Sequence, residues 1–405
     1  MPRFDAPAPD GLDLTLYTLY ADRSIAPAET VRRIWPHLGE LGITRLARQT
    51  GLDRIGIPCW AAFRPNSRNL AGAQGKGLTD AAACASAAME ALEAAIAEAP
   101  VTPGCVASAE ALAARGEAWF DPERLLPFGT GLDRRQPIGW LAGVDIATGR
   151  AIWVPRDIVD MDGERSDLPG VCKTSNGLAS GNTTEEALFH GLCELIERDA
   201  TTLWSTLADD AALATAIAAA DFADPAVTGL ARQVETAGFR LGLFDQTADL
   251  GIPVVMAVLG PDRAGFVGEL DIAAGYGAHP VAARAALRAI SEAAQSRVTS
   301  IAASRDDIHS AAFDGAAAAV NRRLLAAPPV APAPRGLPAD TPLAALVARL
   351  VDVLSDRNIA VVKLDLAPCD RPYAVVKLVS ADLEDRAANI NWRPGWRCFD
   401  AVARR

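Results

Sequence analysis

The stretch from Ser175 to Asp199 constrains the fold of this chain more than any other. A turn rich in Gly, Asn and Ser leads straight into an expected helix of about 184–208. That helix carries Glu186, Glu194 and Glu197 close to one face at helical spacing. Because like charges on one face repel, the pattern indicates either a solvated acidic stripe or carboxylates held together by a cation.

Two further expected helices repeat this design, and both follow glycine-containing segments that we expect to be turns. The first runs from Thr79 or Asp80 to Glu98, and the other from about 280 to 303. In each, three polar side chains fall at i, i+4 and i+7: Ser86, Glu90 and Glu93 in the first, and Arg288, Glu292 and Gln295 in the other. Three such sets favour the interpretation that a cation holds the carboxylates.

Carboxylate oxygens are hard ligands that suit Mg²⁺, which keeps several waters and bridges to phosphate oxygens. Lys76, Arg198 and Arg288 are suited to neutralising phosphate charge. The residue types therefore indicate activation of a substrate by a nucleotide.

The common nucleotide-binding motifs do not account for this pattern. A Walker A loop requires Gly where Leu70 stands and Ser or Thr where Gly77 stands. The segment from Gly275 to Pro280 imitates a dinucleotide-binding turn but ends in Pro rather than Gly. No Gly-x-Ser-x-Gly element is present.

Composition excludes several classes of protein. The net charge of −11 disfavours a nucleic-acid-binding surface. No secretion signal opens the chain, and no apolar run approaches the ~20 residues that span a bilayer. The seven cysteines form no Cys-x-x-Cys pair, which argues against a disulfide scaffold or a zinc ribbon. We therefore expect a cytoplasmic protein without nucleic-acid or membrane partners.

Helices and strands are expected to interleave irregularly, which predicts an α+β fold with mixed sheets rather than a doubly wound one. Residues 1–50 are predicted to form an N-terminal arm and a short helix. Residues 51–405 are predicted to form one domain with a Pro-rich loop at 326–342. We also expect a hairpin over 140–155, a helix over 225–237, and strands at 55–64, 239–244, 253–259, 269–274, 360–365 and 373–380.

Several long motifs resemble the YcaO family of ATP-dependent peptide-modifying enzymes. The matching stretches are Arg64–Ser67, Gln74–Thr79, Ser86–Glu93, Ser175–Asp199, Arg288–Arg297 and Ser304–Asp307. The resemblance implies a YcaO-type fold in which long Glu-bearing helices surround ATP and its Mg²⁺ ions.

Residue roles follow from the resemblance at matching positions. Glu90, Glu93, Glu194, Glu197 and Glu292 would be metal or phosphate-side ligands, and Glu186 would belong to the same cluster. Ser86, Arg198, Arg288 and Lys76 would contact the nucleotide, with Gln295 lining the site. The catalytic group is expected to be Glu197, Arg198 and Gln295. One departure is Ala94, which stands where the family often has Arg.

In the family, a nucleophile adds to a backbone carbonyl and ATP phosphorylates the amide oxygen, which makes that oxygen a good leaving group. External sulfide gives a thioamide, whereas a Cys, Ser or Thr side chain gives an azoline. Azoline-forming members often end in a Pro-rich tail, but this chain ends Phe399–Arg405. It is most similar to the compact members that act with a TfuA-like partner and form thioamides.

Three functions stay open at this stage. The leading one is thioamide formation on a peptide or protein substrate with a TfuA-like partner protein. The others are an azoline-forming cyclodehydratase and, from a different class, a non-catalytic scaffold for a sulfur-modifying partner. A homodimer is compatible with each of them. The sequence specifies neither the peptide nor the sulfur source.

Overall fold

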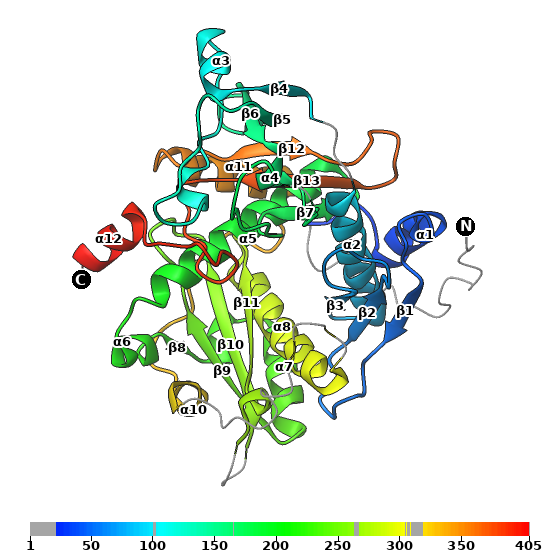
Figure 1. The fold of residues 1–405 in the computed structure, drawn as a ribbon. Helices are drawn as coiled ribbons and strands as arrows, with labels where there is room; N and C mark the ends of the chain where they lie inside the picture. The colour runs from blue at the N-terminus through cyan, green and yellow to red at the C-terminus, as the bar shows by residue number, and fades with distance from the viewer. Residues whose placement is uncertain are drawn as a thin grey trace. The chain divides into compact units, whose positions relative to one another are not determined.

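The computed structural model describes residues 22–404 except 100–102, 165, 263–266, 304, 306–307 and 309–318. Two compact units make up the chain, which Figure 1 traces from end to end. The first unit comprises the described residues up to Asn66, Leu70–Ala91 and Leu207–Pro342. The second comprises Ser67–Asn69, Leu92–Thr206 and the described residues from Leu343. The predicted boundary at residue 50 stays a prediction, and most of the expected N-terminal arm lies outside the described residues.

The first unit is built on two antiparallel sheets, ordered β1-β2-β3 and β11-β10-β9-β8. Its elements are α1 (Pro27–Leu38), β1 (Arg45–Arg48), β2 (Cys59–Phe63), β3 (Gly72–Lys76), the first part of α2 (Asp80–Glu98), α6 (Asp209–Leu213), β8 (Ala216–Ile217), η3 (Ala219–Phe222), α7 (Pro225–Thr236), β9 (Phe239–Asp245), β10 (Val254–Pro261), η4 (Glu269–Asp271), β11 (Ala273–Ala278), α8 (Ala282–Ala302) and α10 (Ala319–Ala326).

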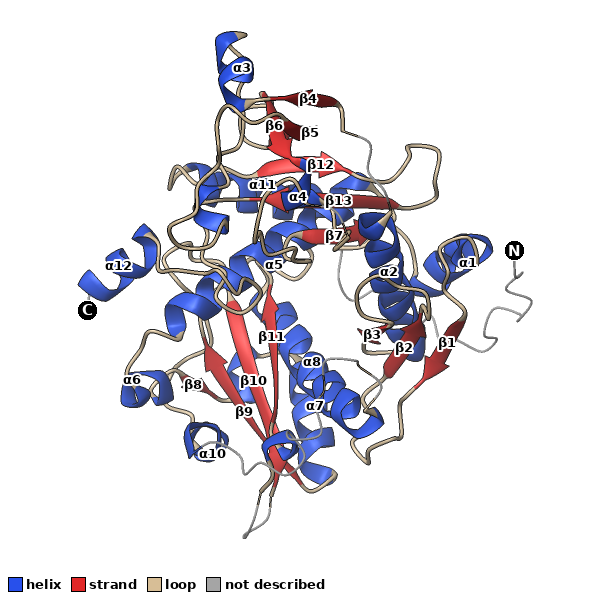
Figure 2. Ribbon diagram, viewed as in Figure 1, coloured by secondary structure: helices blue, strands red, loops and turns tan. Residues whose placement is uncertain are grey.

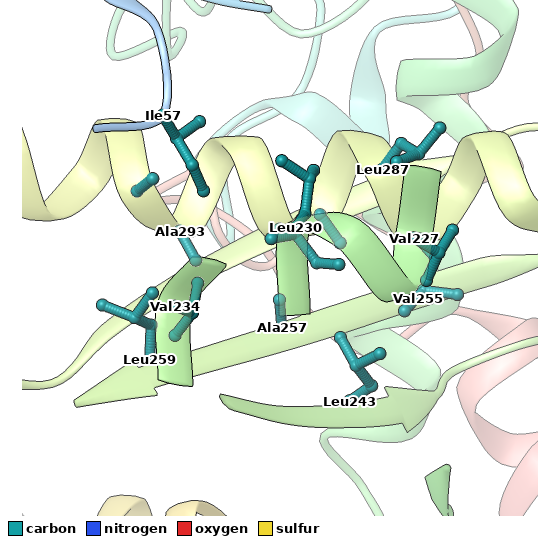
Figure 3. Close-up of a cluster of buried hydrophobic side chains, with 14 of the residues drawn as sticks. Ile57, Val227, Leu230, Val234, Leu243, Val255, Ala257, Leu259, Leu287 and Ala293 are labelled. Carbon is teal, nitrogen blue, oxygen red and sulfur yellow. The ribbon is translucent and has the colours of Figure 1, made fainter. Parts of the chain in front are cut away.

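The core of the first unit lies where α7 and α8 pack against its four-stranded sheet (Figure 3). Val227, Leu230 and Val234 recur at i, i+3 and i+7 and give α7 a buried apolar face. The rest of the cluster drawn in Figure 3 comes mainly from β9, β10 and α8: Ile57, Leu243, Val255, Ala257, Leu259, Leu287 and Ala293. This packing fixes α8, the helix that carries Arg288, Glu292 and Gln295.

The second unit contains one larger antiparallel sheet, ordered β4-β5-β12-β13-β7, with β6 paired to β5 (Figure 2). Its elements are the last part of α2, β4 (Cys105–Ala107), α3 (Ala109–Ala114), η2 (Glu123–Leu125), β5 (Ile138–Asp145), β6 (Ala151–Pro155), α4 (Arg156–Val159), β7 (Leu178–Gly181), α5 (Thr184–Trp204), α11 (Leu343–Ser355), β12 (Val362–Asp365), β13 (Ala374–Val379) and α12 (Trp396–Ala403).

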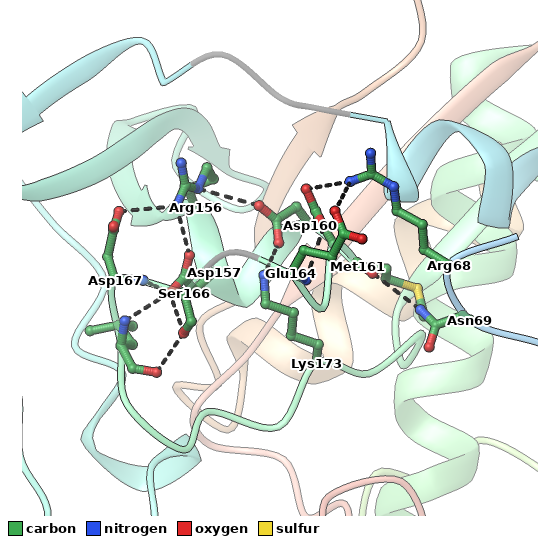
Figure 4. A network of polar contacts seen from close by, with 12 residues as sticks. Arg68, Asn69, Arg156, Asp157, Asp160, Met161, Glu164, Ser166, Asp167 and Lys173 are labelled. Atoms are coloured by element: carbon green, nitrogen blue, oxygen red, sulfur yellow. Dashed lines mark hydrogen bonds and ion pairs between the residues drawn. The ribbon is translucent and has the colours of Figure 1, made fainter.

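A buried polar network fastens the segment between α4 and β7 (Figure 4). The Asp157 carboxylate accepts hydrogen bonds from the Ser166 hydroxyl and from the backbone N–H groups of Asp167 and Leu168, at 2.5–2.8 Å. Asp160 pairs with both Arg156 and Lys173. Because buried charges are tolerated only when paired and hydrogen-bonded, this network holds the segment that leads into β7 in one arrangement.

The α+β class is confirmed, while every described ladder between named strands is antiparallel. Of the expected mixed sheets, the described residues show only two isolated parallel bridges, Trp119 with Trp153 and Ile217 with Ala331. The strand expected at 269–274 is misplaced, because residues 269–271 form the 3₁₀ helix η4 and β11 begins at Ala273. Among the described helices, none combines the length and apolar character that a bilayer requires.

The expected Gly-rich turns are largely strands, so that part of the prediction is wrong. Residues 178–181 form β7, and β3 and β11 contain Gly75 and Gly277. A Cβ on Gly75 would lie 2.1 Å from the backbone N of Ala87, and one on Gly277 would lie 2.3 Å from the carbonyl O of Ala285. Glycine is needed there because each strand backbone packs directly on the helix that follows it.

Candidate active site

In the first unit, an ion pair joins two of the predicted site residues. Lys76 at the end of β3 places its Nζ 2.5 Å from Glu292 Oε2 on α8. The other carboxylate oxygen of Glu292 accepts the backbone N–H of Tyr276 at 3.4 Å. Both side chains of the pair are largely enclosed, so the ammonium group offsets a charge that would otherwise be poorly solvated.

Glu90 on α2 belongs to the same part of the first unit. The surrounding protein raises the pKa of Glu90 to about 7 by desolvation, although the residue as a whole is exposed to solvent. Lys76, Arg305 and a backbone hydrogen bond from Gln74 act to lower this pKa, and Glu292 acts to raise it. A carboxylate in this setting gains from a further cation, because the cation favours its charged form.

The remaining predicted residues of the first unit lie on the same two helices. Ser86 is half-buried one turn before Glu90, and Arg288 is half-buried one turn before Glu292. The Oε1 atom of Gln295 is buried and has no hydrogen-bond partner among the described residues. Such an orphaned acceptor is rare in proteins and fits a side chain that serves a bound ligand.

In the second unit, Glu93 is fixed by the strand β7. Its Oε1 accepts the Ser180 backbone N–H at 2.7 Å and the Ser180 hydroxyl at 2.6 Å. Two donors on one oxygen hold the carboxylate in a single orientation. The sequence prediction named Glu93 but not Ser180.

Helix α5 presents Glu194, Glu197 and Arg198 in the second unit. Desolvation raises the pKa of Glu194 to about 7, and the neighbouring Glu197 raises it further. Arg198 acts in the other direction, with its Nη2 at 3.9 Å from Glu194 Oε1. This distance is too long for a hydrogen bond, so the pair is looser than the one between Lys76 and Glu292.

Glu186 lies at the N-terminus of α5 and is fully buried. Its Oε2 accepts the backbone N–H and the side-chain amide of Asn182, at 2.9 and 2.8 Å. Its own backbone N–H donates to the hydroxyl of Thr183, the N-cap residue. These contacts form a helix cap and account for the burial of Glu186, while its role as a cofactor ligand stays a prediction.

Lys377 on β13 interacts electrostatically with the predicted site residue Glu194, and the sequence did not predict it. Its buried ammonium group donates to the carbonyl oxygens of Thr174 and Asn176, at 2.5 and 2.8 Å. Burial lowers the pKa of Lys377 to about 8, and Glu194 and Asp385 act against this shift. The signal in the sequence was a single Lys within an otherwise apolar strand, Ala374–Val379.

These donor sets fit magnesium and a phosphate ligand. Within the described residues, no three His, Cys, Asp or Glu side chains converge as a metal site made by protein alone. Magnesium does not require such a site, because it is usually bound through one or two carboxylates together with waters and substrate phosphates. Each unit offers one carboxyl group whose charged form desolvation disfavours, Glu90 in the first and Glu194 in the second. The first unit adds the unpartnered acceptor oxygen of Gln295.

Comparison with known proteins identifies the family. The model of the YcaO cyclodehydratases, described as ATP- and Mg²⁺-binding, matches residues 74–384. The chain therefore belongs to the YcaO family, a family of ATP-dependent peptide modifiers. It is 42% identical over 293 residues to a protein in the tfuA 3′ region of Rhizobium leguminosarum bv. trifolii, covering 71% of this chain and 69% of that one. A protein of Methanothermobacter thermautotrophicus is 34% identical over 300 residues, covering 72% of this chain and 74% of that one.

Solved structures show the same fold. YcaO from Methanopyrus kandleri, bound with AMPPCP and Mg²⁺, matches with a TM-score of 0.67 and 24% identity over 91% of this chain and 94% of that one. A heterocyclase in complex with substrate and cofactor matches with a TM-score of 0.71 and 22% identity. The match covers 90% of this chain but 53% of the heterocyclase. The predicted YcaO-type fold and the predicted cofactors, ATP and Mg²⁺, are confirmed at the level of the family.

Proposed function

We propose that this chain activates a backbone amide of a peptide or protein and, with a TfuA-like partner, converts it into a thioamide. The observation that carries the proposal is the 42% identity to the protein in the tfuA 3′ region. The two groups of carboxylates and cations support the ATP-dependent part of the reaction.

The reaction needs activation because an amide oxygen is a poor leaving group. When bound, Mg–ATP would supply the phosphoryl group that makes this oxygen a good one. Hydrosulfide would add to the amide carbon, and the amide oxygen would take the phosphoryl group and depart as phosphate. Loss of the proton on sulfur would then leave a carbon–sulfur double bond. The chain's main tasks are to position the reactants and to neutralise charge.

We assign these tasks to the predicted residues of both units. Glu90 and Glu292 of the first unit, and Glu93, Glu194 and Glu197 of the second, would hold the metal ions. Lys76, Arg198 and Arg288 would neutralise the charge of the phosphates. Ser86 and Gln295 would contact the nucleotide. Two hydrogen bonds from Ser180 fix the orientation of the Glu93 carboxylate, so this metal ligand would not have to reorient during the reaction.

A second candidate function is azoline formation. The description of the family as cyclodehydratases and the likeness in fold to a heterocyclase favour it. Here a Cys, Ser or Thr side chain of the peptide, rather than hydrosulfide, would add to the carbonyl.

Mass spectrometry of a treated peptide separates the two products. Exchange of oxygen for sulfur adds about 16 Da, whereas cyclodehydration removes about 18 Da, as follows from amide-oxygen activation. We expect the gain, and only with ATP, sulfide and a TfuA-like protein present. A loss of water produced by this chain alone would overturn the thioamide assignment.

The catalytic assignment has its own test. Glu197→Gln should abolish ATP turnover in a folded protein, whereas Glu110→Gln, an exposed change on α3, should leave turnover unchanged. Wild-type turnover by a folded Glu197→Gln protein would exclude Glu197 from the site. Absence of ATP turnover by the wild-type chain, both with and without a candidate peptide, would instead favour the non-catalytic scaffold.

A further inference from the structure

The second unit exposes apolar side chains that proteins normally bury. On α12, the red helix at the end of the chain in Figure 1, Trp396, Phe399 and Val402 are 44%, 68% and 56% exposed. They recur at i, i+3 and i+6 and therefore share one face of the helix. Phe128 and Ile390 are 89% and 90% exposed.

The opposite face of α12 is firmly attached to α5. The Arg397 guanidinium donates to both oxygens of Asp199, at 2.7 and 2.6 Å, and both side chains are buried. Cys398 is buried beside it, and its backbone N–H donates to Glu384 at 3.4 Å. Because a buried ion pair fixes this face, the apolar side chains cannot turn inward without breaking it.

Polar contacts join the two loops that carry Phe128 and Ile390. Arg393 donates to the carbonyl oxygen of Glu123 at 2.7 Å, and its guanidinium lies 5.8 Å from the ring centroid of Phe128. Asn391, next to Ile390, donates to the carbonyl oxygen of Gly170 at 2.8 Å. We call the exposed side chains of Phe128, Ile390, Trp396, Phe399 and Val402 the α12 surface.

Two arginines lie beside the α12 surface, although the chain as a whole carries a charge of −11. Arg386 lies 5.9 Å from the ring of Trp392, and Arg393 lies over Phe128. Within the part of the chain that the structure describes, neither arginine is paired with a carboxylate. Arg404, the C-cap residue of α12, forms an ion pair with Asp400 at 2.8 Å. Two uncompensated guanidinium groups favour an acidic ligand.

We infer that the α12 surface is the docking site of the partner protein, which contacts it through an apolar segment flanked by carboxylates. This inference rests on the proposed function, which requires a partner. Exposed apolar patches rimmed by charge are typical of protein–protein interfaces, and aromatic and Arg side chains carry much of their binding free energy. The ion pair between Arg397 and Asp199 attaches α12 to α5. Asp199 lies two residues after Glu197, so α12 is held next to the part of α5 that carries predicted site residues.

The test measures the affinity of a purified TfuA-like protein from the same genome for this chain by titration calorimetry. Phe399→Asp should weaken binding about tenfold or more, because it places a charge in the apolar centre. Val106→Asp is the matched control, since Val106 is 70% exposed on β4 of the same unit, and it should bind as wild type. Circular dichroism checks that both variants fold.

Salt dependence tests the charged rim independently. Wild-type affinity should fall as ionic strength rises, and the double variant Arg386→Glu, Arg393→Glu should bind more weakly and lose most of that dependence. Unchanged affinity in Phe399→Asp would overturn the inference while leaving thioamide formation intact. So would a change from dimer to monomer in free Phe399→Asp, because the surface would then join two copies of this chain. Thioamide formation by the wild-type chain without any partner would instead remove the partner from the proposed function, and the docking site with it.

Discussion

The two units hold their predicted site carboxylates in different ways. In the first unit, Glu292 has a close cationic partner, with Lys76 Nζ at 2.5 Å. In the second, the ion pair of Glu194 with Arg198 is loose, at 3.9 Å, and Glu197 repels it, although the charge of Lys377 also favours the ionised form of Glu194. The buried lysine of the second unit donates to backbone carbonyls rather than to a carboxylate.

Desolvation nevertheless raises the pKa of one carboxyl group in each unit, Glu90 and Glu194, to about 7. The comparison indicates that the first unit compensates its carboxylate charge within the protein, whereas the second leaves more of it for a ligand to compensate. Stability and activity should therefore respond differently to matched substitutions in the two units.

The largest effect should come from neutralising one carboxylate in each unit. We expect Glu292→Gln and Glu194→Gln each to lower ATP turnover about 10³-fold, because charge stabilisation is lost in both. Only Glu292→Gln should also lower the free energy of unfolding, by about 1 kcal/mol, since Lys76 loses its partner. Steady-state kinetics and urea unfolding measure the two quantities, and an equal loss of stability in both variants would contradict the comparison.

Removing the buried lysine of the second unit should be the next largest effect. Lys377→Met should lower the free energy of unfolding by about 3 kcal/mol, because two carbonyl groups lose their charged donor. The control is Lys363→Met on the adjacent strand β12. Its ammonium group pairs with the exposed Asp365, so the substitution should cost about 1 kcal/mol or less. Equal losses of unfolding free energy in urea titrations of the two variants would show that the hydrogen bonds from Lys377 to Thr174 and Asn176 add no stability beyond that of an exposed ion pair.

Ligand binding tests whether both units serve one nucleotide. Mg–ATP at a hundredfold excess over its dissociation constant should stabilise the wild-type protein by ~2.7 kcal/mol, through binding to the native state. This stabilisation should shrink in both Glu292→Gln and Glu194→Gln. A thermal melt in which only one of the two variants loses the shift would assign the nucleotide to that unit alone.

Taken per pH unit, the smallest effect should be a difference in the pH dependence of stability between one buried base of each unit. Desolvation lowers the pKa of His279 in the first unit to about 4 and that of Lys377 in the second to about 8. Each base is therefore protonated in the unfolded chain at pH values where it is neutral in the fold. Stability should rise with pH from about 4 to 6.5 through His279, and from about 8 to 10.5 through Lys377, by at most ~1.4 kcal/mol per pH unit each.

Urea unfolding across these ranges checks the assignment. His279→Asn should flatten only the acidic range, and Lys377→Met only the alkaline one. Loss of both slopes in a single variant would mean that the two bases do not titrate independently.

Local patterns in the sequence were sufficient for the elements that carry the site. The helices expected over 79–98, 184–208 and 280–303 are observed as Asp80–Glu98, Thr184–Trp204 and Ala282–Ala302. Capping residues, apolar periodicity and Ala-rich composition act within a few residues of one another, so these helices could be predicted without knowledge of the fold. The family motifs lie on the same helices, and the matching residues could therefore be named from the sequence.

Only the tertiary structure decided what the glycine segments form and which charges meet. Gly75 and Gly277 read as turn residues, but they lie in strands whose ladders and helix contacts involve distant segments. Lys76 and Glu292 are 216 positions apart, and Lys377 reaches Thr174 across 203. Spacing along the chain encodes which side chains share a helix face, whereas contacts between segments so far apart depend on packing of the whole unit.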